Sequence, residues 1–178
     1  MFSRDYFGKT EAVSEEKKRR QMACLLDYTM TMPAPDRLNF ELGLKGIFRA
    51  DLVVGNDAAR KFVLIDFEDA TQKSLFDKGP KQYRYWSAKL EHGSGQIIDW
   101  ACAKNTNPAA PILVNTFEGR VHEDCYVVVC GRNPPIGSLE DERFNYRKSL
   151  KMLGVTFQLY TYDNMVDAMS SNVDALLL

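Results

Sequence analysis

Two neighbouring apolar segments carry acidic residues at positions where a buried strand would normally place hydrophobic ones. Asp51 lies within segment 47–54, and Asp66 and Glu68 lie within segment 61–68. Both segments are rich in β-branched and aromatic residues, which favours strands. Burying an unpaired carboxylate costs several kcal/mol or forces the group to bind a proton. These three acids therefore need a compensating partner if the segments form the core of a sheet.

A divalent cation is the partner that best fits three such acids. Residues two apart in a strand share a face, so Asp66 and Glu68 should point the same way, with Asp51 beside them if the two strands pair. Magnesium prefers oxygen ligands, and together with carboxylates it stabilises charge on phosphates. The acids therefore indicate a metal-dependent phosphodiesterase. The alternatives are a solvated strand face, or an unrelated α/β protein in which the acids form salt bridges with Arg49 and Lys61.

The order of hydrophobic patterns predicts an α/β fold with a mixed central sheet flanked by helices. We expect a helix over 14–28, then an antiparallel three-strand meander over 39–44, 47–54 and 61–68. A charged loop over 69–81 and a helical region reaching about residue 104, interrupted at 93–95, should follow. The remaining expected elements are a strand at 124–130 buried on both faces, a helix at 139–153, a strand at 155–160, and a short helix capped by Asp163. We expect one domain over 1–178, with its core at about 14–170.

Composition and charge limit the classes of protein to consider. The chain has 178 residues, 45% of them hydrophobic and 26% charged, with a net charge of −1. No apolar run approaches the roughly 20 residues needed to span a membrane, so we expect a cytoplasmic protein without a membrane partner. The four cysteines have unrelated spacings, which disfavours a disulfide framework or a zinc site. The small net charge disfavours nonspecific coating of nucleic acid but leaves room for a local basic groove.

Such a groove is indicated by basic and aromatic residues that alternate between positions 72 and 104. The candidate nucleic-acid-binding residues are Lys73, Lys78, Lys81, Arg84 and Lys89. They are interleaved with Tyr83, Tyr85 and Trp86, and Trp100 and Lys104 follow. This composition suits backbone contacts and base stacking, although an ordinary solvated surface explains the charges equally well. His92 and His122 share no metal-ligand spacing, and both are interpreted as loop residues.

Three segments together resemble the PD-(D/E)xK nuclease superfamily and, more narrowly, the nuclease domain of Shedu anti-phage defence proteins. The two acid-bearing segments resemble the family's metal-binding strands, and 95–100 resembles its glutamine-bearing helix. Segments 127–132 and 161–165 resemble its C-terminal part. The similarity runs from about Glu15 to Ala168, and its specificity comes from the order and spacing of the motifs.

The resemblance implies an endonuclease that cleaves DNA with Mg²⁺ or Mn²⁺. It implies that Asp51, Asp66, Glu68 and Gln96 are catalytic and that the three acids bind the metal. It further implies DNA as a partner, a homo-oligomer and a phage-derived trigger. Glu68 occupies the place usually held by lysine, so the site would lack a built-in cation unless Lys61, Lys73 or Lys81 supplies one. The alternative is a catalytically degenerate nuclease-fold module that binds DNA or protein partners.

Overall fold

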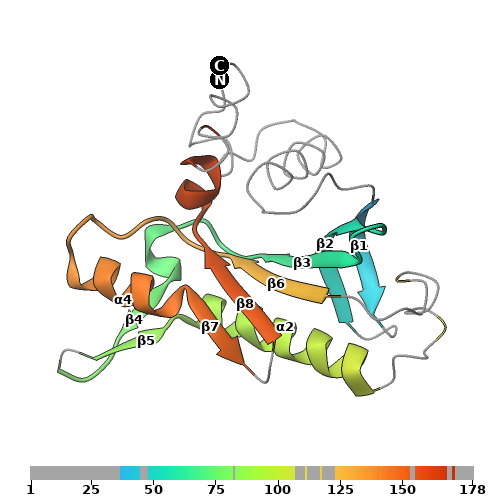
Figure 1. Ribbon diagram of the computed structural model, residues 1–178. Coiled ribbons are helices and arrows are strands. Elements are labelled where there is room, and N and C mark those ends of the chain that lie inside the picture. The colour runs from blue at the N-terminus through green and yellow to red at the C-terminus, as the bar shows by residue number, and fades with distance from the viewer. Residues whose placement is uncertain are drawn as a thin grey trace, which may run out of the picture.

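A six-stranded sheet forms the centre of the protein, with the strand order β1-β2-β3-β6-β8-β7 (Figure 1). The computed structural model describes residues 37–44, 48–81, 83–106, 111, 117, 123–152, 155–167 and 170. The strands are β1 (Arg37–Leu44), β2 (Phe48–Asn56), β3 (Lys61–Phe67), β6 (Glu123–Val129), β7 (Ser149–Met152) and β8 (Val155–Tyr160). The predicted helix over 14–28 lies outside the described residues.

The sheet is mixed, as the sequence predicts. β1, β2 and β3 pair in antiparallel order, which confirms the meander. β6 runs parallel to both β3 and β8, and β7 returns antiparallel to β8. Because β3, β6 and β8 are parallel, their carboxyl ends meet at one edge of the sheet, where α/β proteins commonly place their ligands.

Helices cover both faces of this sheet. The long helix α2 (Ala88–Thr106) lies along one face (Figure 1), where its Trp100 joins the larger hydrophobic cluster. A short helical segment at 162–167 contributes Met165 to the cluster on the other face. β6 supplies residues to both clusters in alternation, which confirms that this strand is buried on both faces.

Two predictions about helices are wrong. α2 continues through residues 93–95 without interruption. The helix expected over 139–153 is only α4 (Leu139–Arg147), because Lys148 ends it and the following residues pair with β8 as β7. Strand pairing supplies hydrogen bonds that only the folded chain offers, so it overrides the local helical pattern.

The segment expected to be a charged loop holds regular structure as well. It contains a 3₁₀ turn (Gln72–Ser74) and β4 (Phe76–Lys78), which pairs with β5 (Arg84–Trp86) in a separate two-stranded sheet. Strands of three residues are too short to give a clear alternation. The cap of the last helical segment is also different, since the Thr161 hydroxyl accepts from the Asn164 backbone N–H at 3.0 Å.

Among the described residues, no helix is both long and apolar enough to cross a membrane.

Candidate active site

Asp66 and Glu68 lie at the carboxyl end of β3 on the face covered by α2, as their spacing predicts. A Cβ atom placed on Gly93 of α2 would lie 2.7 Å from Asp66 Oδ2 and 3.1 Å from Glu68 Cγ. The first distance is shorter than real Cβ contacts and the second is tight, so a side chain at position 93 would force the acids or the helix to shift. A glycine inside a helix costs about 1 kcal/mol relative to alanine, and here it makes space for the two carboxylates.

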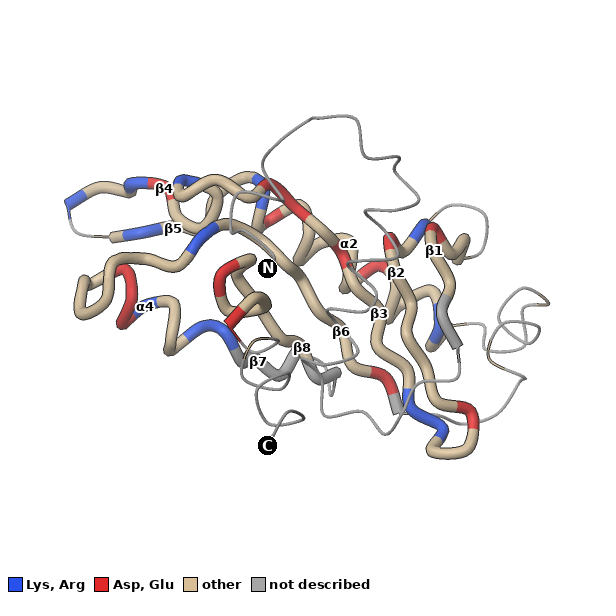
Figure 2. Tube along the Cα trace, turned by 90° about the horizontal axis from the view of Figure 1, so that it is seen from above, with Lys and Arg blue, Asp and Glu red and all other residues tan. Residues whose placement is uncertain are grey.

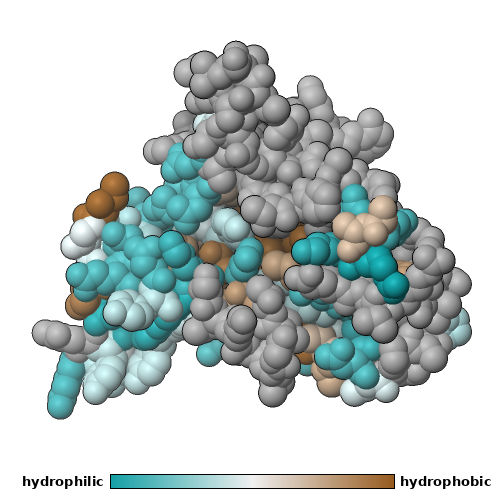
Figure 3. All heavy atoms as spheres, viewed as in Figure 1, coloured by the Kyte–Doolittle hydropathy of each residue, from teal (hydrophilic) through white to brown (hydrophobic). Residues whose placement is uncertain are grey.

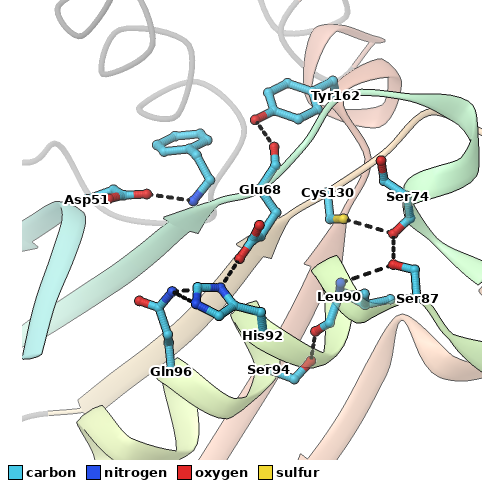
Figure 4. A network of polar contacts seen from close by, with 11 residues as sticks. Asp51, Glu68, Ser74, Ser87, Leu90, His92, Ser94, Gln96, Cys130 and Tyr162 are labelled. Atoms are coloured by element: carbon cyan, nitrogen blue, oxygen red, sulfur yellow. Dashed lines mark hydrogen bonds and ion pairs between the residues drawn. The ribbon is translucent and has the colours of Figure 1, made fainter.

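Asp51 reaches the same region from β2. Its Oδ2 accepts a hydrogen bond from the Phe67 backbone N–H at 2.9 Å (Figure 4). The last register pair between β2 and β3 joins Leu52 to Ile65, so the Asp51 carboxylate binds a backbone donor just beyond the end of the ladder. This contact brings a third acid to the end of β3.

The regular alternation of β1 and β2 changes near Asp51. Leu52 packs in the cluster on one face of the sheet, whereas Ala50 packs in the cluster on the other face. In the adjacent β1, Glu41 has a positive φ of 50°, which is uncommon for a residue other than glycine. The Glu41 carboxylate lies 3.6 Å from the Arg49 guanidinium. Arg49 therefore pairs with Glu41, and its charge also lowers the pKa of Asp51.

Asp66 is the most perturbed of the three acids. Its side chain is buried, with the residue only 3% exposed, and its Oδ2 has no hydrogen-bond partner among the residues that the structure describes. Burial, followed by the charges of Asp51 and Glu68, raises the pKa of Asp66 from 3.8 to about 7, and His92 opposes this shift. Burial also raises the pKa of Asp51, against the lowering effect of the Phe67 N–H.

A histidine that the sequence did not single out joins this site. His92 lies in α2, so its interpretation as a loop residue is wrong, and its Nδ1 is 2.5 Å from Glu68 Oε1. Gln96, one helical turn further on, places its Nε2 3.0 Å from His92 Nδ1 and 3.4 Å from His92 Nε2 (Figure 4). The spacing of His92 and Gln96 on one helix face is the sequence signal that indicates this pairing.

Residues that follow β6 and β8 support the same edge. The Tyr162 hydroxyl donates to the Glu68 backbone carbonyl at 2.7 Å. Arg132 Nη2 lies 2.8 Å from Asp163 Oδ1, which ties the segments after β6 and β8 together. The Cys130 thiol is buried, and burial raises its pKa to about 12, so it remains a protonated structural group.

Four of the five predicted nucleic-acid-binding residues are exposed, whereas the fifth, Arg84, is half-buried in an ion pair. Lys73, Lys78, Lys81 and Lys89 are exposed around the β4–β5 hairpin and the start of α2, where Figure 2 shows basic residues gathered. Arg84 is half-buried, and its Nε lies 3.0 Å from Glu140 Oε1 of α4. It therefore ties the hairpin to α4.

The far end of α2 does not extend this basic surface. Lys104 is buried, with its Nζ 2.7 Å from Asp124 Oδ1 and 3.8 Å from the centre of the Phe117 ring. Trp100 is fully buried in the core. Neither side chain can reach a nucleic acid, which limits the expected groove to the hairpin and the first turn of α2.

Carboxylate oxygens are the donor type that a hard divalent cation prefers. Asp66 supplies a buried carboxylate oxygen that accepts no hydrogen bond from any described residue. Within the described part of the chain, no group of three or more His, Cys, Asp or Glu side chains is arranged so that it could hold a metal ion by itself. Magnesium commonly needs only one or two carboxylates, with waters and phosphate oxygens completing its shell. The residues present are therefore compatible with such an ion.

The fold and the site together define an α/β domain with a nuclease-like core. The family model described as Shedu protein SduA, C-terminal, matches residues 5–166. The chain therefore belongs to the Shedu family, in agreement with the resemblance of its motifs. Comparison with curated proteins gave no match. Membership of the family indicates a nuclease-like function in defence against phages.

Proposed function

We propose that this protein is a Mg²⁺- or Mn²⁺-dependent endonuclease that hydrolyses DNA in anti-phage defence. The observation that carries the proposal is the buried Oδ2 of Asp66 at the end of β3, which has no hydrogen-bond partner among the residues that the structure describes. Asp51 and Glu68 raise the pKa of this carboxyl further through their charges. A protein gains nothing in stability from three acids arranged in this way, so the arrangement is best explained by a bound cation.

Each of the three acids would be held in position to bind the ion by a different contact. Asp66 is fixed by burial, and Asp51 is oriented by the Phe67 N–H, which occupies one of its two oxygens. The Glu68 carboxylate is held by His92 and stands where other members of the superfamily carry lysine. When bound, the ion would supply a Lewis acid for the scissile phosphate and lower the pKa of a water.

The exposed basic residues would contact the DNA backbone. Lys73, Lys78 and Lys89 surround the hairpin and the start of α2, and the exposed Tyr83 and Tyr85 offer ring surfaces for base stacking. Figure 3 shows a mainly hydrophilic surface at the end of the molecule that carries α4 and the hairpin. The basic residues of this surface lie on the hairpin, whereas the first turn of α4 is acidic, so the hairpin side is the one that favours a polyanion.

Cleavage of plasmid and linear DNA tests the proposal directly. The wild-type protein should cleave in the presence of Mg²⁺ or Mn²⁺ and should be inactive in a chelator. Asp66→Asn should abolish cleavage, whereas Asp99→Asn, an exposed position on α2, should leave it unchanged. Equal cleavage by the wild type and Asp66→Asn would refute the assignment of Asp66.

DNA binding is measured separately, in the absence of cleavage. Substituting both Lys78 and Lys81 by alanine should reduce the slope of log affinity against log salt by about 2, because each lysine would neutralise one phosphate. Binding that survives Asp66→Asn, with neither metal binding nor cleavage by the wild type, would identify a non-catalytic binding module instead.

A further inference from the structure

The side chain of His92 forms a hydrogen bond from α2 to an acid of the site. Its Nδ1 lies 2.5 Å from Glu68 Oε1, while the neighbouring Gly93 lets the helix backbone pack against Asp66 and Glu68. The imidazole itself is largely exposed, with 64% of its side-chain surface accessible, whereas the Glu68 side chain is 9% exposed. The exposed imidazole of His92 therefore contacts a largely buried carboxylate.

The hydrogen bonds around the ring determine its orientation. An ionised Glu68 only accepts hydrogen bonds, so His92 Nδ1 must carry the proton that it donates. His92 Nε2 is then the ring nitrogen that can accept. The Gln96 amide nitrogen lies 3.0 Å from Nδ1 and 3.4 Å from Nε2, and with the proton on Nδ1 only the longer of these two contacts can be a hydrogen bond. A continuous chain results, in which Gln96 donates to His92 and His92 donates to Glu68.

We propose that His92 is a positioning residue for the nuclease site, which holds the Glu68 carboxylate in place, and that Gln96 fixes the imidazole in the required tautomer. The proposal rests on the proposed function. Gln96 then acts on the site through His92, and both residues serve to orient the Glu68 carboxylate. Groups that orient a ligating side chain in this way typically change metal affinity or activity by about 10- to 100-fold when they are removed.

The tautomer of His92 is the first test, and it needs neither metal nor DNA. Long-range ¹H–¹⁵N correlation spectra distinguish the two neutral tautomers of histidine, and the chain has only two histidines, His92 and His122. The metal-free wild-type protein, with the imidazole neutral, should show His92 protonated at Nδ1. Glu68→Ala should remove this preference. A wild-type His92 protonated at Nε2 would overturn the proposal.

Activity and metal affinity provide the second test, with two variants of matched shape. Asn at position 92 places an amide nitrogen as many bonds from Cα as the histidine Nδ1, so it can still donate to Glu68, whereas Leu has similar branching and no donor. His92→Leu should lower kcat or Mn²⁺ affinity by about 10- to 100-fold without raising KM for DNA, and His92→Asn should restore most of the loss.

The outcomes separate this proposal from the one on which it rests. A wild-type protein that does not cleave DNA refutes the proposed function, while the tautomer still reports whether His92 holds Glu68. Wild-type cleavage with equal activity and Mn²⁺ affinity in His92→Leu refutes the positioning role alone. An equal loss in His92→Leu and His92→Asn would also refute it, because the hydrogen bond would then not be the cause.

Discussion

Replacing Asp66 by asparagine should stabilise the metal-free protein, and the gain should grow with pH. The carboxyl is buried and has no hydrogen-bond partner among the described residues, and its pKa is raised from 3.8 to about 7. Between these two values the folded protein keeps the proton and the unfolded chain loses it. The folded state therefore loses stability relative to the unfolded state as pH rises through this window. Asparagine has nearly the same shape and does not ionise, so it escapes this loss.

The size of the effect follows from the shift. The raised pKa is about 3 units above the ordinary value, and each unit corresponds to about 1.4 kcal/mol, so the cost of ionised Asp66 has a ceiling of about 4 kcal/mol above pH 7. The same linkage gives a cost of about 2 kcal/mol near pH 5 and almost none below pH 3.8. The gain in Asp66→Asn should follow this curve.

Urea unfolding of both proteins in a chelator, at a series of pH values, measures the free energies directly. Asp99→Asn, at an exposed position of α2, is the matched control and should differ little from wild type at any pH. A gain that does not depend on pH, or an Asp66→Asn protein less stable than wild type at about pH 8, would contradict a raised pKa as its origin.

Three further results are expected. Gly93→Ala should destabilise the protein by about 1 to 3 kcal/mol and impair DNA cleavage, because its Cβ would lie 2.7 Å from Asp66 Oδ2. Gly95→Ala is the matched control, since a Cβ there would meet no atom within 4 Å apart from its own helix backbone and chain neighbours, and it should stabilise α2 by up to about 1 kcal/mol. Urea unfolding compares the two variants. Lys104→Met should lower the free energy of unfolding by about 3 kcal/mol by leaving the Asp124 carboxylate without its buried partner, and an unchanged unfolding midpoint would contradict this. Saturating Mn²⁺ should raise the melting temperature of the wild type but not that of Asp66→Asn, and an equal rise in both would place the bound ion elsewhere.

The part of the fold that positions the acids could be predicted from sequence because it depends on local patterns. Two apolar runs rich in β-branched residues, separated by a turn, define β2 and β3, and the spacing of Asp66 and Glu68 defines the face that these two acids share. The nearly continuous apolar run of β6 likewise indicates a strand covered on both sides, and both clusters confirm it. These features require no knowledge of distant contacts.

The features that were missed depend on contacts between distant parts of the chain. β7 forms from a segment with a helical pattern because β8 offers it a partner. His92 gains its role only when α2 packs against β3, and Lys104 is removed from the surface only by its contacts with Asp124 and Phe117. Residue type and spacing predict which chemistry is possible, whereas tertiary packing decides which side chains take part.

Anomalous diffraction from a crystal of the wild-type protein soaked in Mn²⁺ tests the central claim most directly. We predict a manganese peak at the carboxyl end of β3, within coordination distance of Asp66 and at least one of Asp51 and Glu68. An ordered, accessible site that shows no peak there at saturating Mn²⁺, or a peak only at other carboxylates, would contradict the claim that these acids bind a divalent cation.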